Sequence, residues 1–112
     1  MALSWRSGEG VNTDTIDTIA DGVAGRHPIP EVLQDLLEVV DDVVLVSDET
    51  IKAGMQHLFD CAGLVVEPSA ALGVAAVLED RARFQGRRIA TIICGSNVLR
   101  SDFQRWVLDP RS

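Results

Sequence analysis

Apolar and polar residues alternate along the chain in blocks that predict helices and strands in turn. Four segments with apolar residues three or four positions apart are predicted helices: 30–40, 48–62, 69–78 and 100–108. Three short runs rich in β-branched residues are predicted strands of the buried type: 43–46, 64–66 and 88–93. Parallel strands need crossover helices between them, so this order predicts an α/β fold with three layers, αβα, around a short parallel sheet.

The whole chain is predicted to form one partial α/β domain over residues 1–112. Its parts are a helix end that looks cut short, a loop, the helix/strand alternation and a tail: 1–8, 9–29, 30–108 and 109–112. Three strands make a small sheet whose outer edges need a cover. We therefore expect the domain either to form a homo-oligomer or to be a piece of a larger sheet.

Charge and cysteine content narrow the range of partners. Ten basic and 17 acidic residues give a net charge of −7, with no basic block to offset it locally. This composition argues against a nucleic-acid partner. No apolar run approaches the roughly 18 residues of a membrane-spanning helix, so no membrane partner is expected. Two cysteines do not make a disulfide framework in a chain of this size, which indicates a reduced, cytoplasmic setting.

Polar residues follow two of the predicted strands at their carboxyl ends. Glu67 comes directly after the strand at 64–66, and Cys94 and Gly95 come after the strand at 88–93. Parallel sheets bind ligands at this edge, and a glycine lets the backbone approach a ligand closely. Simpler roles stay open at this point. The Glu67 carboxylate could only satisfy backbone donors, Ser69 could only cap a helix, and Cys94 could be a small apolar filler.

No functional role is predicted for the remaining reactive side chains. Cys61, in the middle of a helix, is predicted to be a buried filler, and His57 is predicted to lie at or near the surface. Lys52, the sole lysine, stands in the first turn of a helix, where a solvated role is the default. No metal-ligand set is predicted, and no glycine-rich phosphate loop of the dinucleotide or P-loop type is present.

Four segments resemble a known family in both their order and their spacing: 18–23, 41–49, 66–76 and 94–98. They are similar to the C-terminal part of threonine/serine dehydratases, and the resemblance covers nearly the whole chain. That family belongs to the fold-type II pyridoxal-phosphate enzymes, with serine racemase and the tryptophan synthase β chain. The resemblance implies pyridoxal phosphate as cofactor and a small amino acid as substrate. It also implies loss of water by β-elimination, then loss of ammonia to give a 2-oxo acid.

The resemblance assigns cofactor-binding roles to three residues and a catalytic role to none. Cys94 matches a position beside the pyridine nitrogen of the cofactor, where a neutral thiol would leave that nitrogen largely unprotonated. Glu67 matches a position near the cofactor ring. Gly95 matches the loop beneath the ring, although Ser96 stands where the family often has a second glycine.

The same resemblance implies that parts of the enzyme lie elsewhere. The Schiff-base lysine of the family precedes the matched region, and Lys52 aligns with an ordinary helix position. The loop that binds the cofactor phosphate has no counterpart in this sequence. We therefore expect a C-terminal fragment that is inactive as an isolated chain and that a complementary N-terminal chain would complete. The alternative is a stand-alone, non-enzymatic α/β module that self-associates through its sheet edge.

Overall fold

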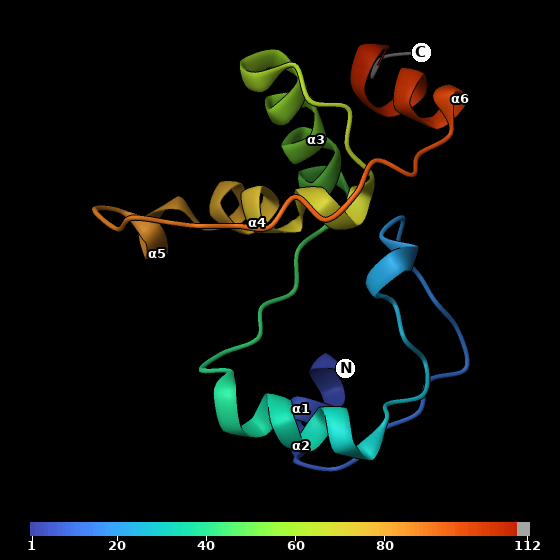
Figure 1. Cartoon of the computed structure of the whole chain (residues 1–112), viewed down its shortest axis with the longest axis vertical. Helices are drawn as coiled ribbons and strands as arrows, with labels where there is room; N and C mark the ends of the chain where they lie inside the picture. The colour runs from blue at the N-terminus through green and yellow to red at the C-terminus, as the bar shows by residue number, and fades with distance from the viewer. Residues whose placement is uncertain (110–112) are drawn as a thin grey trace. The chain divides into compact units, whose positions relative to one another are not determined.

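The computed structural model describes residues 1–109 and divides into two compact units, Met1–Leu45 and Val46–Ser112. All the regular structure formed by residues 1–109 is helical (Figure 1). The predicted organisation as one partial domain over 1–112 stays a prediction. The expected tail at 109–112 lies almost wholly outside the described residues.

The first unit opens with helix α1 (Ala2–Ser7), the short helix that the sequence predicts there. Gly8 ends it with φ 76°, a left-handed conformation, and its N–H donates to the Ser4 carbonyl oxygen at 2.9 Å. The buried Ser4 hydroxyl accepts a hydrogen bond from the Val11 N–H at 3.0 Å. The chain that follows α1 is therefore tied back to the helix.

The rest of the first unit is a loop and one amphipathic helix. The loop contains a single 3₁₀ turn, η1 (Asp21–Val23), and leads into α2 (Pro30–Val39), which begins at a proline as predicted. Among the apolar residues of α2 only Leu33 is buried, whereas Val32 is 43% exposed. The helical spacing of the apolar residues is correct, but most of them remain open to solvent.

The second unit begins with α3 (Asp48–Ala62), which starts and stops where the sequence predicts. The Ser47 hydroxyl accepts a hydrogen bond from the Thr50 N–H at 3.2 Å and so caps the first turn. Gly63 ends the helix with φ 66°, and its N–H donates to the Phe59 carbonyl oxygen at 2.8 Å. Both ends of α3 are thus set by local residues.

Glu79, the last residue of α4 (Pro68–Glu79), joins the end of that helix to the start of α3. Its Oε2 accepts hydrogen bonds from the Ser47 hydroxyl at 3.2 Å and the Ser47 N–H at 3.4 Å. A hydrogen bond from the Thr50 hydroxyl, together with those from Ser47, lowers the pKa of Glu79 below its usual 4.5, with desolvation opposing them. A carboxylate at the positive end of α3 is also favourable for the helix dipole.

Helices α3 and α4 pack so closely that a glycine is needed between them. A Cβ at Gly54 would lie 3.2 Å from the Ala71 carbonyl oxygen and 3.3 Å from the Ala75 nitrogen. The buried side chains of the two helices include large residues from α3 and alanines from α4: Ile51, Met55, Ala70, Ala71 and Ala75. The run of small residues in α4 therefore serves the close approach of the two backbones.

Three short helical turns complete the second unit. After α4 comes α5 (Arg81–Phe84), and α6 (Arg100–Phe103) follows segment 88–93 and continues into the π-helical turn η2 (Gln104–Leu108). Phe103 and Val107 are buried, as the predicted last helix requires. The ring of Phe103 meets that of Phe59 edge to face, with centroids 5.5 Å apart.

The predicted short parallel sheet is not formed by residues 1–109. The segments 43–46, 64–66 and 88–93 are extended, but none is a strand. A ladder needs a backbone partner along the length of each strand, whereas segments 64–66 and 88–93 meet only beyond their carboxyl ends, where the Glu67 N–H donates to the Gly95 carbonyl oxygen at 3.2 Å. Segment 88–93 instead runs beside α4 (Figure 1).

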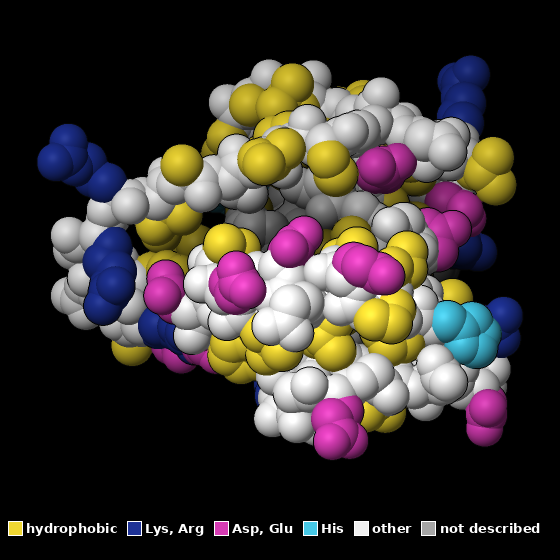
Figure 2. Space-filling view, turned by 60° about the horizontal axis from the view of Figure 1, so that its bottom comes forward, with side chains coloured by type: hydrophobic (Ala, Val, Ile, Leu, Met, Phe, Trp, Pro, Cys, Tyr) yellow, Lys and Arg dark blue, Asp and Glu magenta, His cyan; other side chains and the backbone are white. Residues whose placement is uncertain are grey.

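The contact between α4 and segment 88–93 centres on Gly73. A Cβ at this position would overlap the Thr91 hydroxyl and lie 2.7 Å from the Thr91 Cβ. The extended segments leave apolar side chains open to solvent, with Leu45 67% exposed and Ile92 82% exposed. Figure 2 shows hydrophobic side chains interspersed with acidic ones on one face of the molecule.

Candidate functional site

Glu67 lies where an extended segment turns into α4 and is held there by its own backbone and carboxylate. Its backbone is extended, with φ −76° and ψ 160°, and Pro68 starts the helix. Its N–H donates to the Gly95 carbonyl oxygen, and its Oε2 accepts a hydrogen bond from the Asn97 N–H at 3.2 Å. The carboxylate therefore links the start of α4 to the loop after segment 88–93.

Cys94 completes the group of residues that we call the Glu67 cluster: Glu67, Cys94, Gly95 and Asn97. The Cys94 thiol is exposed and donates to Glu67 Oε1 over 3.9 Å, a long contact for a hydrogen bond to sulfur. The structure thus brings together the three residues that the sequence singles out. Their proposed part in cofactor binding stays a prediction.

Gly95 provides the space that the Glu67 carboxylate occupies. A Cβ at residue 95 would lie 2.5 Å from Glu67 Oε1 and 2.9 Å from Glu67 Cδ. Any other residue would therefore have to displace the carboxylate. The sequence indicates that glycine here permits a close approach, and the structure shows that the approaching group is this carboxylate.

The structure tests the simpler roles left open for Glu67 and Ser69, namely satisfying backbone donors and capping a helix. Glu67 does accept a backbone N–H, as the bland role requires, but the donor belongs to Asn97 and not to the first turn of α4. Ser69 is not the N-cap of α4, because it lies inside the helix. Asn97 enters the cluster through its backbone N–H. This contact could not be predicted from side-chain motifs, because every residue except proline has a backbone N–H.

The other reactive side chains lie outside the Glu67 cluster. Lys52 Nζ pairs with Glu49 Oε1 at 2.7 Å across the first turn of α3. His57 is exposed, as predicted, but the prediction that Cys61 is a buried filler is wrong. Cys61 lies one helical turn from His57 on the exposed side of α3, with its Sγ 3.9 Å from both ring nitrogens.

Residues 1–109 offer neither a metal site nor a membrane-spanning helix. No three His, Cys, Asp or Glu residues come together there in a way that could hold a metal ion. None of the helices in this part of the chain combines the length and the apolar character needed to cross a membrane.

Two enzymes of known structure, a threonine deaminase and a serine racemase, have folds similar to that of this chain. A threonine deaminase from the organism abbreviated T.th. superposes with a TM-score of 0.80 at 32% sequence identity, over 88% of this chain and 35% of that one. A maize serine racemase gives a TM-score of 0.80 at 29% identity, over 93% of this chain and 33% of that one. These neighbours are fold-type II pyridoxal-phosphate enzymes, so the α/β class of the predicted fold is supported although its sheet is not.

The sequence leads to the same group of proteins. The family model described as pyridoxal-phosphate dependent enzyme matches residues 1–95, and the chain belongs to this family. An L-threo-3-hydroxyaspartate ammonia-lyase of Pseudomonas sp is 35% identical over 95 residues, which are 85% of this chain and 30% of that protein. An L-threonine ammonia-lyase of Thermotoga maritima is 33% identical over 98 residues, 88% of this chain and 24% of that protein.

The resemblance to threonine/serine dehydratases is thereby confirmed at the level of the family, and pyridoxal phosphate is the cofactor of the intact family. This chain spans about a third or less of the length of the curated relatives that it matches.

Proposed function

We propose that this chain supplies the C-terminal part of the cofactor site of a pyridoxal-phosphate-dependent threonine or serine ammonia-lyase, and that it is inactive by itself. The complete enzyme would remove water from L-threonine or L-serine and then release ammonia to give a 2-oxo acid. The observation that supports this proposal best is the Glu67 cluster. In a chain of this family, hydrogen bonds join Glu67 to the loop that carries Cys94 and Gly95.

The residues of the cluster fit the ring side of the cofactor. The exposed Cys94 thiol offers a single neutral donor, and Gly95 leaves room for the Glu67 carboxylate beside it. When bound, pyridoxal phosphate supplies the electron sink that lets the substrate lose its α-proton. Cys94 would hold its proton at Sγ toward the ring nitrogen, which competes with Glu67 Oε1 as the acceptor.

The negative charge of Glu67 indicates that other groups hold the cofactor phosphate. Glu67 is acidic, so the cluster would repel a phosphate dianion and must leave that group to a separate site. Lys52 is paired with Glu49 and lies outside the cluster. We therefore propose that the lysine that carries the cofactor and the phosphate-binding loop lie outside these 112 residues, on an N-terminal segment or on a complementary chain.

A titration of the purified chain with pyridoxal phosphate tests the inactivity of the chain alone. Absorbance is followed, the sample is reduced with borohydride, and the labelled peptide is mapped. We expect slow, nonspecific amine labelling without saturation. Saturable attachment at Lys52 would overturn this part of the proposal, and the Lys52→Arg variant serves as the control because it keeps the charge but cannot attach the cofactor.

Complementation tests the positive part of the proposal. The N-terminal portion of the Thermotoga maritima L-threonine ammonia-lyase, ending where its match to this chain begins, is mixed with the chain, cofactor and L-threonine or L-serine. We expect 2-oxo acid to form, and less of it with Cys94→Ala. Product that is absent from every mixture, despite a stable complex of the two polypeptides, would count against an enzymatic role.

Exposed apolar side chains favour a second candidate, a non-enzymatic module that forms a homo-oligomer. Leu45 and Ile92 lie open on extended segments that could pair with a second copy. Solution mass separates the two candidates, since a stable closed dimer that Ile92→Lys disrupts favours the module. Under either candidate we place the chain in the cytoplasm, where its two free thiols would stay reduced.

A further inference from the structure

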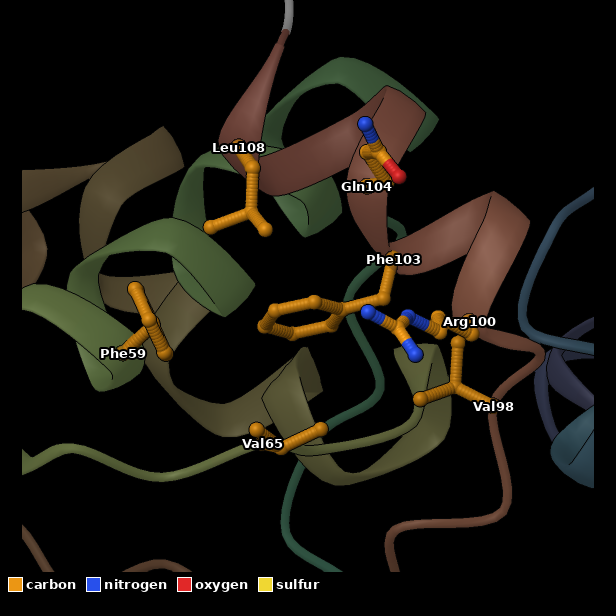
Figure 3. Close-up of a pocket in the computed structure, with 7 residues that line it drawn as sticks. All are labelled: Phe59, Val65, Val98, Arg100, Phe103, Gln104 and Leu108. Atoms are coloured by element: carbon orange, nitrogen blue, oxygen red, sulfur yellow. The ribbon is translucent and has the colours of Figure 1, made fainter.

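A cavity of about 560 Å³ lies beside the Glu67 cluster but shares no residue with it. Its wall comes from α3, the extended segment before α4, and α6 with η2: Phe59, Val65, Val98, Arg100, Phe103, Gln104 and Leu108. Figure 3 shows the Phe103 ring projecting into the middle of this space, with Phe59 and Leu108 around it. The volume falls in the range of about 300–1,000 Å³ that is typical of small-molecule sites.

The wall of the cavity is apolar apart from two side chains. Phe59, Val65, Val98, Phe103 and Leu108 present rings and aliphatic groups. One N–H of the Gln104 amide donates to Asp109 Oδ2 at 3.1 Å, and the amide carries no charge that would attract an ionised ligand. Arg100 is therefore the charged group in the wall of the cavity that can select a ligand.

Arg100 is exposed, and its guanidinium is free of hydrogen bonds and ion pairs within residues 1–109. Figure 3 places it at the side of the cavity, next to Phe103 and Val98. The nearby Arg105 differs, because its Nη2 pairs with Asp102 Oδ1 at 2.8 Å and its guanidinium lies over the Trp106 ring. Of these two arginines, only Arg100 has a guanidinium without a partner among residues 1–109.

We propose that this cavity is a binding site for a small carboxylate with an aromatic or branched apolar tail. The tail would lie against Phe59 and Phe103, where offset or edge-to-face contacts with a ring are favourable. The carboxylate would face Arg100, whose planar guanidinium matches it with two parallel hydrogen bonds. The proposal does not depend on the proposed function, because the cavity shares no residue with the Glu67 cluster.

The test uses the full chain and 3-phenylpropionate as the probe. Binding is followed by calorimetry and by ¹H–¹⁵N spectra, in which we expect saturable shifts at Val98, Phe103 and Leu108 and none in 2–7. The neutral analogue 3-phenylpropanamide should bind about five- to tenfold more weakly, as should 3-phenylpropionate to Arg100→Gln, because each change removes a charge-assisted hydrogen bond at an exposed arginine.

Arg105→Gln is the matched control, because it removes the same charge from the same part of the chain. It should leave the affinity for 3-phenylpropionate within about twofold of that of the unchanged chain. The affinity of Arg100→Lys should lie between those of Arg100→Gln and the unchanged chain. The proposal is overturned if the amide binds as tightly as the acid, if Arg100→Gln has no effect, or if no saturable binding occurs. It is also overturned if inorganic phosphate binds as well as the probe, since the apolar wall would then contribute nothing.

Discussion

Replacing Gly95 with alanine tests whether the Glu67 cluster is a built arrangement. The new Cβ would lie 2.5 Å from Glu67 Oε1 and 2.9 Å from Glu67 Cδ, both well inside normal contact. These atoms are at the end of a flexible side chain, so the carboxylate can swing away at little steric cost. What is lost is the bond from the Asn97 N–H to Oε2 and the weaker contact from Cys94.

The size of the effect follows from these bonds. A hydrogen bond to a charged group contributes about 1.5–3 kcal/mol, and the partial exposure of Glu67 puts this one at the lower end. We therefore expect Gly95→Ala to reduce the free energy of unfolding by about 1–2 kcal/mol. With a denaturant slope of about 1–2 kcal/mol per M, the urea midpoint falls by about 1 M.

Urea unfolding followed by circular dichroism measures this change. Gly25→Ala is the matched control, because a Cβ there meets nothing within 4 Å and φ is not positive. In a Glu67→Ala background the clash disappears, so Gly95→Ala should then cost much less, which a double-mutant cycle detects. If Gly95→Ala and Gly25→Ala unfold alike, the reasoning about the carboxylate is refuted.

Three further predictions concern the packing of the second unit. Gly73→Ala should gain about 1 kcal/mol of helix propensity but lose more, about 1–3 kcal/mol, through the clash with Thr91. Limited proteolysis should then cut segment 88–93 faster, and Thr91→Gly should restore resistance. Ser47→Ala removes the cap of α3 and should lower the free energy of unfolding by about 1 kcal/mol in thermal or urea melts, whereas Ser47→Asp should recover much of it. The Glu79 carboxyl has a pKa below 4.5 in the folded chain, so its stabilising effect is present above that pH and is lost as the pH falls through the folded pKa. Melts of Glu79→Gln and the unchanged chain should therefore differ at pH 7 and converge in acid, and a gap that persists at low pH would contradict this assignment.

The helices and their ends could be predicted from the sequence because their causes are local. Ser47 caps α3, Gly63 ends it and Gly8 ends α1, each through bonds within a few residues. The proximity of Glu67 to Cys94 and Gly95 could also be predicted. Glu67 follows one extended run, Cys94 and Gly95 follow another, and the carboxyl ends of the two runs come together. Family membership followed from four short segments, and the comparisons confirm it.

Other features depend on what surrounds each segment, and only the tertiary structure decided them. The runs at 43–46, 64–66 and 88–93 have strand composition, but a strand exists only where a neighbour supplies backbone partners. Cys61 looks like a buried filler within α3, yet its exposure depends on which side of the helix is covered. The cavity around Phe103 combines residues from 59 to 108, and the free guanidinium of Arg100 depends on which acids lie nearby. Such features arise from contacts between distant residues, which periodicity and capping rules do not encode.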